Sequence, residues 1–323
     1  MSSDTNSSSP STTNVVKHTL SPAAIAARGQ EITGLDILLP TAEVIDPSRV
    51  VDLMADMHAD VPTGGTDYTY GEKDTQYLRY WKPSLTSKPP IIIYIHGGSW
   101  RAGTYLDSIG SAKVSHLTNQ GYAFATVNFS LLPSVTVEEQ VQEVADAIGY
   151  LVRNAENLAF DAEKVILMGH SSGAHVAALL GTDASYLGHA GIPISTVRGV
   201  VALDGSNYNA FAEITDSPGP IAENQTFALG TDPKRLNRVS PTYHARAPNA
   251  GAFLFLHVQR RSGVRQAVEF VAALEAAGTE AELRVFEGEW FEGHVGLLLN
   301  IGKTEYPATG LGLFWQKVQV LWH

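Results

Sequence analysis

The stretch KVILMGHSSGAHVAALLG (164–181) decides the fold of this chain. Its opening, KVILM, has the short apolar run of a strand buried on both faces, and its end, AHVAALLG, has the composition of a helix. Between them stands a G-x-S-x-G pattern centred on Ser171, at the turn from strand to helix. A serine on such a turn is exposed at the end of its strand, flanked by glycines that permit the sharp fold and followed by the positive end of a helix. The pattern therefore predicts that Ser171 is a nucleophile.

Short apolar runs alternate with helical stretches on both sides of this turn. The alternation predicts an α/β fold with a mostly parallel central sheet flanked by helices. The start of one helix is marked, because Thr136 and Glu139 form a capping box ahead of apolar residues at helical spacing. The expected strands are residues 91–95, 122–129, 164–168, 199–203, 252–258 and 282–286, after an opening hairpin at 66–71 and 75–82.

Composition divides the chain into three expected parts. Residues 1–19 begin with a Ser/Thr/Asn-rich segment that has too little apolar surface to fold, so we expect a flexible tail. Residues 20–65 contain moderately helical pieces but are too few for a core of their own, which predicts a small N-terminal cap over the sheet. Residues 66–323 form the expected catalytic domain.

A second glycine-rich segment, HGGSW (96–100), follows the expected strand 91–95. A loop at this place can bring backbone N–H groups over a carbonyl oxygen under attack, and glycine keeps that approach open. We expect the N–H groups of Gly97 and Gly98 to form an oxyanion hole together with that of Ser172. Trp100 has two interpretations, a packing aromatic or one wall of the substrate pocket.

HGGSW, GHSSGAH and HVGLLLNIG (294–302) together resemble the esterase/lipase branch of the α/β-hydrolase superfamily. Carboxylesterase-like and arylformamidase-like members are the more similar ones, and the resemblance covers roughly residues 66–323. It implies that His294 is the general base, in a loop after the last strand. The sequence itself places EGEWFEGHVG (287–296) after that strand, at the edge of the sheet where ligands bind in such folds.

The acid that orients the histidine is missing from its usual place. The family carries an Asp after the strand matched here by AFLFLHV (252–258), whereas this chain has no carboxylate from residue 259 through 268 and has Arg260 and Arg261 instead. The acid has three possible interpretations: Asp204 one strand earlier, a glutamate beside His294, or no acid at all. The glutamates concerned are Glu287, Glu289 and Glu292.

The composition of the chain disfavours several kinds of binding partner and cofactor. A net charge of −11 disfavours nucleic acid and anionic membrane surfaces, and no apolar run is long enough to span a membrane. The absence of cysteine removes thiolate chemistry, and no histidine pairing at metal-ligand spacing occurs, so we expect no metal and no cofactor. The N-terminus has no pattern of a secretory signal, which makes a cytoplasmic location the default expectation. The oligomeric state stays open.

These residues predict a serine hydrolase that cleaves a small carboxylic ester through an acyl-enzyme. Two alternatives stay open: an arylformamidase-type amide hydrolase, and a hydrolase fold reused for a non-hydrolytic reaction such as that of an isomerase, lyase or cyclase. The missing acid motivates the second alternative, since arginines near the pocket could hold a carboxylate-bearing ligand. Aromatic residues near the expected site, Trp100, Trp290 and Phe291, suggest a small-molecule substrate with an apolar or aromatic acyl group.

Overall fold

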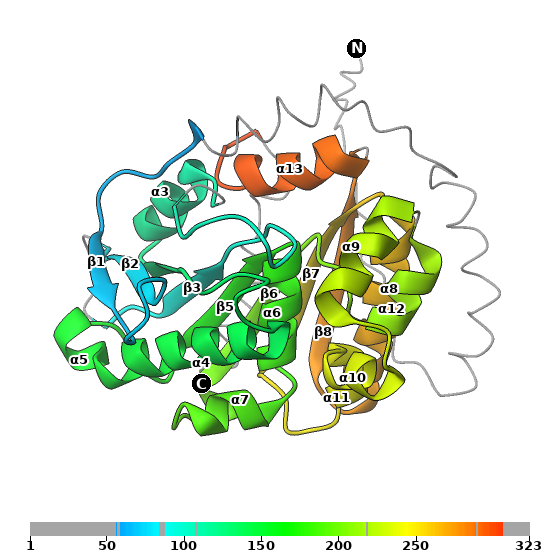
Figure 1. Cartoon of the computed structure of the whole chain (residues 1–323). Coiled ribbons are helices and arrows are strands. Elements are labelled where there is room, and N and C mark those ends of the chain that lie inside the picture. The colour runs from blue at the N-terminus through cyan, green and yellow to red at the C-terminus, as the bar shows by residue number, and fades with distance from the viewer. Residues whose placement is uncertain are drawn as a thin grey trace, which may run out of the picture. The chain divides into compact units, whose positions relative to one another are not determined.

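A single sheet of eight strands, in the order β1-β2-β4-β3-β5-β6-β7-β8, runs through the described part of the chain (Figure 1). The β1–β2 and β2–β4 pairs are antiparallel, and all other neighbours are parallel. The predicted fold class is therefore confirmed. The strands are β1 (Thr66–Thr69), β2 (Tyr77–Trp81), β3 (Ile91–Ile95), β4 (Ala123–Val127), β5 (Val165–His170), β6 (Val197–Leu203), β7 (Ala252–Val258) and β8 (Glu280–Phe286).

This computed structural model describes residue 56 and residues 59–83, 88–106, 109–217, 219–288 and 290–305, without the side chains of residues 220 and 290. The expected tail (1–19) and most of the expected cap (20–65) lie outside the described residues, so both stay predictions. No helix in the described ranges is long and apolar enough to cross a membrane.

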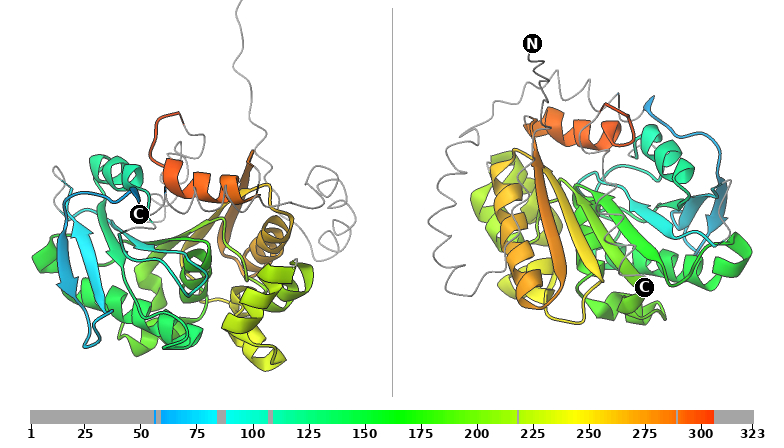
Figure 2. Two further views of the ribbon diagram at one scale, coloured as in Figure 1. Left: turned by 45° about the horizontal axis from the view of Figure 1, so that its top comes forward. Right: turned by 180° about the vertical axis from the view of Figure 1, so that it is seen from behind.

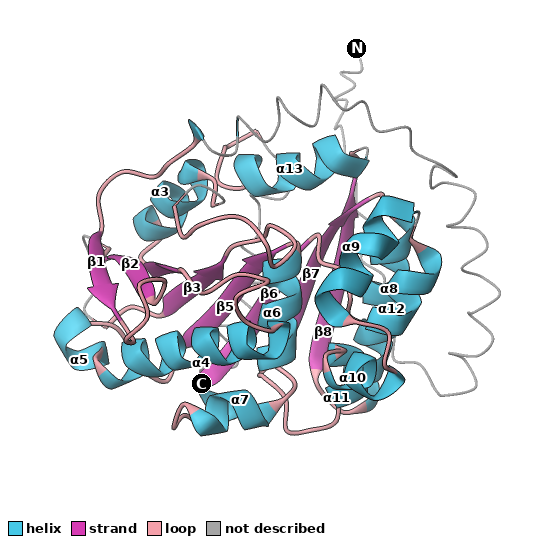
Figure 3. Ribbon diagram, in the orientation of Figure 1, coloured by secondary structure: helices cyan, strands magenta, loops and turns pink. Residues whose placement is uncertain are grey.

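Helices cover both faces of the sheet (Figure 3). Successive side chains of a strand point to opposite faces, and all five residues of β3 are fully buried, so both of its faces are covered. Ile91, Ile93 and Ile95 join a core that includes apolar residues of α4, α6 and α12, whereas Ile92 and Tyr94 join a core with α3 and α13. These helices are α3 (Ser111–Asn119), α4 (Val137–Arg153), α6 (Ser172–Leu180), α12 (Arg261–Ala276) and α13 (Trp290–Asn300).

The capping box predicted ahead of α4 is present. Thr136 Oγ1 accepts a hydrogen bond from the backbone N–H of Glu139, and the Glu139 carboxylate accepts one from the N–H of Thr136. The apolar residues at helical spacing along α4 are fully buried, which ties this helix to the sheet.

A run of short helices between β6 and β7 was not predicted. The helices are α8 (Ala210–Asp216), α9 (Gly219–Leu229), α10 (Pro233–Arg238) and α11 (Pro241–His244). Figure 2 shows them gathered beside α12. Local signals do mark two of their starts, because the side chains of Asn209 and Asp232 accept hydrogen bonds from the first turns of α8 and α10. Two shorter helices, α5 (Ala155–Leu158) and α7 (Ala184–His189), complete the layer around α4.

A fully buried lysine joins α3 to α13. Lys113 Nζ donates a hydrogen bond of 2.6 Å to the backbone oxygen of Leu298. Burial lowers the pKa of Lys113 to about 7, against the opposing effect of Asp60. The ammonium form is therefore disfavoured in the folded protein relative to the unfolded chain.

This burial predicts a pH-dependent stability that a Lys113→Met variant lacks. Between pH 7 and the unfolded pKa of 10.5, the unfolded chain binds the proton that folded Lys113 releases, so raising the pH stabilises the wild type. We expect the free energy of unfolding of the wild type, minus that of the variant, to rise by about 3 kcal/mol or more from pH 7 to about pH 10. Urea unfolding of both proteins at the two pH values measures this difference, and parallel pH profiles would contradict it.

Candidate active site

Five neighbouring parallel strands end at one edge of the sheet, and each leads into one part of a polar cluster. The order β3-β5-β6-β7-β8 brings their carboxyl ends side by side. Such an edge is where ligands bind in open α/β sheets. In sheet order, the strands lead to the loop 96–100, Ser171, Asp204, Arg260 and the helix α13 that carries His294.

Ser171 stands on a sharp turn between β5 and α6. Its φ of 56° and ψ of −123° are strained for a residue with a side chain, and α6 begins at the next residue. The turn needs a glycine two residues later, because a Cβ on Gly173 would lie 2.2 Å from the backbone oxygen of Ile95. This strand–turn–helix geometry is the one expected for a nucleophile elbow, at the position that the sequence pattern predicts.

The loop after β3 lies against this elbow. A Cβ on Gly97 would lie 3.0 Å from the Cβ of Ser171, so only glycine lets the loop approach so closely. The N–H of Trp100 donates to Ser172 Oγ at 3.3 Å, which fastens the loop to the start of α6. Within the described ranges, no acceptor takes a hydrogen bond from the N–H groups of Gly97, Gly98 or Ser172. These three donors are the ones expected for an oxyanion hole.

Trp100 packs in the core beneath the loop. Its exposed fraction is 3%, its ring centre lies 5.3 Å from that of His175 with the two rings nearly perpendicular, and its backbone oxygen accepts from Gln140 Nε2. So little exposed surface favours the packing interpretation of Trp100 over that of a pocket wall.

His294 lies in α13 and not in a loop. The sequence interpretation of this segment as a loop is wrong, since the helix runs from Trp290 to Asn300. The mixture of glycine, glutamate and aromatic residues before His294 hid the helical turn. The side chain of His294 is 18% exposed, while that of Asp204 is fully buried, and His294 Nδ1 lies 2.5 Å from Asp204 Oδ2.

Asp204 follows β6 and is surrounded by donors. Its Oδ1 accepts from the N–H of Val258 at 3.3 Å, and its Oδ2 accepts from Arg260 Nε at 3.3 Å. His257 Nδ1 lies 3.1 Å from Oδ1, at an angle that makes no hydrogen bond. Burial alone would raise the pKa of Asp204, but the charge of Arg260 and the contacts with the two histidines outweigh burial and hold it well below its usual range. The carboxylate is therefore ionised at neutral pH.

The other carboxylates considered for this role stand elsewhere. Glu287 is exposed on the turn after β8, Glu292 is in the first turn of α13, and Glu289 lies outside the described residues. His294 Nδ1 donates its hydrogen bond to the carboxylate of Asp204, which follows the strand before the usual one.

His170 links the elbow to α13, a contact that sequence reasoning missed. Its Nε2 donates to the backbone oxygen of His294 at 2.9 Å, and the two rings lie 4.3 Å apart. Burial, followed by the effect of His294, lowers the pKa of His170 well below its usual value, so the ring stays neutral. A carbonyl can only accept, and His170 therefore carries its proton on Nε2. In this part of the chain, Ser171 Oγ and His294 make no hydrogen bond to each other.

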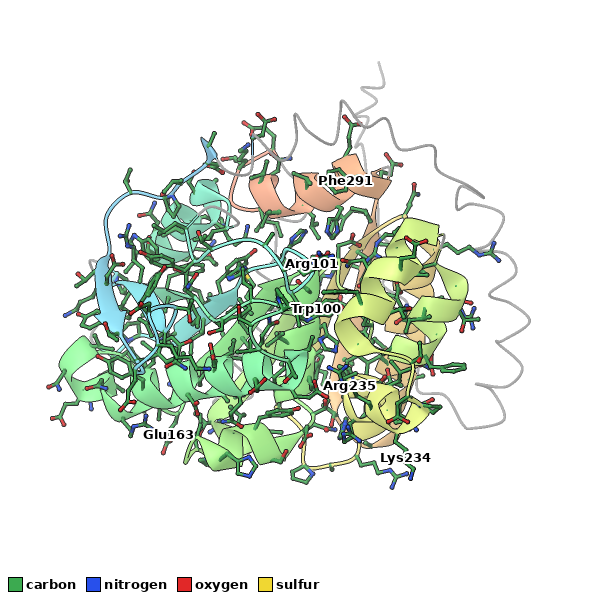
Figure 4. All side chains as sticks on the ribbon, in the orientation of Figure 1. Trp100, Arg101, Glu163, Lys234, Arg235 and Phe291 are labelled. Atoms are coloured by element: carbon green, nitrogen blue, oxygen red, sulfur yellow. The ribbon has the colours of Figure 1, made fainter. Side chains whose placement is uncertain are left out.

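Phe291 is the described aromatic residue beside His294. Their ring centres lie 6.3 Å apart, and Phe291 is half-buried. In Figure 4, Phe291 lies on α13 above the loop that carries Trp100 and Arg101. The side chain of Trp290 lies outside the described residues.

The parallel sheet, the strained serine turn after β5 and the histidine-carboxylate pair at the same edge define a protein of the α/β-hydrolase class. Within this class the chain belongs to the BD-FAE family, an esterase family whose model matches residues 79–265, more than half of the 323 residues.

Three known proteins illustrate the similarity. A probable isoprenylcysteine alpha-carbonyl methylesterase of Oryza sativa subsp. japonica is 27% identical over 34% of this chain and 25% of its own length. The kynurenine formamidase of Danio rerio is 31% identical over 36% of this chain and 39% of its own length. The crystal structure of esterase B from Lactobacillus rhamnosis superposes with a TM-score of 0.67 at 19% identity, covering 92% of this chain and 96% of that one. The chain thus matches about a quarter of the length of the rice relative, and the likeness to esterase B concerns the fold.

Proposed function

We propose that this protein hydrolyses small carboxylic esters through an acyl-enzyme on Ser171. In this proposal His294 is the general base and acid, and Asp204 orients it. The backbone N–H groups of Gly97, Gly98 and Ser172 stabilise the oxyanion.

The observation that carries the proposal is the contact of 2.5 Å between His294 Nδ1 and Asp204 Oδ2. A carboxylate at this nitrogen keeps the proton on Nδ1, so that Nε2 is unprotonated and can accept a proton through its lone pair. This is the tautomer that a general base needs. The charge on Asp204 also stabilises the imidazolium that forms when His294 accepts a proton. Both effects are strengthened by the full burial of the carboxylate, where the local dielectric is low.

The reaction proceeds in two halves. Ser171 Oγ attacks the ester carbonyl carbon while His294 Nε2 takes the hydroxyl proton; the resulting tetrahedral intermediate expels the alcohol, to which His294 returns the proton. Water then attacks the acyl-enzyme by the same route and releases the acid. In this proposal the hydrogen bond between Ser171 Oγ and His294 forms when substrate is bound, as catalytic hydrogen bonds often do.

The oxyanion site is proposed at the three backbone donors that have no acceptor among the described residues. Gly97 lies against Ser171, and Ser172 is the first residue of α6, so both N–H groups border the place where the carbonyl oxygen develops charge. The bond from the Trp100 N–H to Ser172 Oγ holds the two segments together before substrate arrives.

The names of the relatives support an ester as substrate, and the half-buried ring of Phe291 near His294 supports an apolar or aromatic acyl group. The formamidase of Danio rerio supports a second candidate, cleavage of an N-formyl aryl amide by the same groups. Comparing turnover of p-nitrophenyl esters with that of N-formyl anilides separates the two candidates.

The structure removes the reason for considering a non-hydrolytic reaction. That argument rested on a missing acid and on arginines available to bind a ligand, whereas Asp204 contacts His294 and Arg260 is engaged with Asp204. The hydrolytic proposal is therefore the one we develop.

Ser171→Ala tests the nucleophile. We expect turnover of a short p-nitrophenyl ester to fall by at least about 10³-fold, because no other group can form the acyl-enzyme. The same variant should lose covalent labelling by a fluorophosphonate, read by intact-protein mass. Ser185→Ala, an exposed serine on α7, is the matched control and should keep both properties. A folded Ser171→Ala protein with unchanged turnover would contradict the proposal.

Asp204→Asn tests the acid. We expect a fall in turnover of about 10⁴-fold, since an amide neither stabilises the imidazolium nor enforces the tautomer. Glu287→Gln removes an exposed carboxylate close to His294 in sequence and should leave turnover unchanged. If Glu287→Gln is the damaging change and Asp204→Asn is mild, the acid has been assigned to the wrong residue.

A further inference from the structure

Arg260 occupies the place after β7 where the resemblance led us to expect a carboxylate. It stands directly before α12 as the N-cap residue, and its side chain makes no capping hydrogen bond to the helix. Strands β6 and β7 are parallel neighbours, with Leu203 opposite Leu256, so the residues that follow them lie side by side. Arg260 and Asp204 are thereby brought together from 56 residues apart.

The guanidinium grips the turn that carries Asp204 at three points. Arg260 Nε donates to Asp204 Oδ2 at 3.3 Å, and Nη2 donates to the backbone oxygens of Asp204 at 3.0 Å and Gly205 at 2.7 Å. The planar fork of arginine can reach carboxylate and backbone together, whereas the single ammonium of lysine cannot. Only 12% of the Arg260 side chain is exposed.

This turn requires such a grip. Asp204 has a φ of 42°, a region that residues with side chains rarely adopt and that persists only where the surroundings enforce it. The backbone bond from the Asp204 N–H to the oxygen of Leu256 holds one side of the turn, and Arg260 holds the other.

The first turn of α12 is shaped to admit the guanidinium. A Cβ on Gly263 would lie 2.8 Å from Arg260 Nη2 and 3.1 Å from His257 Nδ1. A glycine at this position leaves the space into which the arginine folds back over its own helix.

We propose that Arg260 is a positioning residue, which holds Asp204 in the orientation that the carboxylate needs to meet His294. The inference rests on the proposed function, because it acts through Asp204 and His294. In its described contacts Arg260 touches neither Ser171 nor the oxyanion donors. The acid that follows β6 therefore depends on an arginine that follows β7.

Because Arg260 is charged, its removal should change the pH dependence of kcat/KM. Any group at the site that must be deprotonated binds its proton more tightly once a neighbouring cation is removed. The acidic limb of kcat/KM should therefore move to higher pH in Arg260→Gln, and stay in place in Arg260→Lys, which keeps the charge. The other ionisable groups that face this pair are His257 on β7, His294 on α13, His170 on β5, Glu213 on α8 and Tyr208 after β6.

The experiment is a double-mutant cycle on ester turnover by the full chain. In the wild-type background we expect Arg260→Gln and Arg260→Lys each to lower kcat by about 10²-fold, with KM little changed, because a misplaced acid misplaces the base. In the Asp204→Asn background the same changes should have almost no further effect, since Arg260 acts only through that carboxylate. Arg261→Gln, the exposed neighbour, is the matched control and should keep wild-type kcat.

A second variant covers the case in which Arg260→Gln does not fold. Gly263→Ala keeps the arginine and its charge but fills the space beside Nη2, so kcat should fall without a shift of the acidic limb. Wild-type kcat in all the Arg260 and Gly263 variants would overturn the proposal. It would also be overturned if the Arg260 substitutions lowered kcat as much in the Asp204→Asn background as in the wild type. If Asp204→Asn alone keeps full turnover, the acid assignment fails instead, so the two failures are distinguishable.

Discussion

The arrangement of residues at this edge of the sheet depends on one fully buried carboxylate, that of Asp204. Asp204 has no exposed surface, and an isolated charge in such a place is very unfavourable. The structure compensates with the N–H of Val258, the guanidinium of Arg260 and the imidazole of His294. These donors come from β7, the start of α12 and α13, so the ends of three elements must converge on one side chain. The elbow at Ser171 joins the same cluster, because His170 beside it donates to the backbone of His294.

Much of the fold was predictable because its signals are local. Runs of five to eight mostly apolar residues marked the six strands from β3 to β8, and two of them, 91–95 and 252–258, match β3 and β7 at both ends. The capping box at Thr136 and the glycine-flanked Ser171 also depend on neighbours within a few residues. The short helices from residue 210 to 244 escaped prediction for the opposite reason. They are held by contacts such as that between Gln266 on α12 and Glu213 on α8, 53 residues apart.

The acid could only be offered as one of several interpretations. Asp204 lies 90 residues from His294, and the sequence pattern says nothing about which strand end faces which nitrogen. The arginines after β7 were understood as a gap in the machinery or as a site for an anionic ligand. In the structure Arg260 lies over Gly263 and hydrogen-bonds to Asp204 and Gly205, which follow the neighbouring strand β6. The arginine that departs from the family pattern is thus engaged with the carboxylate that contacts His294.

The most direct measurement of this account is the tautomer of His294 in the resting protein. Selective ¹⁵N labelling of histidine, with His294→Gln used for assignment, reports which ring nitrogen carries the proton through the ¹⁵N chemical shifts. The account predicts that the neutral form of the ring carries its proton on Nδ1, and that this strongly deshielded proton signal is lost in Asp204→Asn. A His294 ring protonated at Nε2, or one whose Nδ1 signal is the same with and without the Asp204 carboxylate, would contradict it.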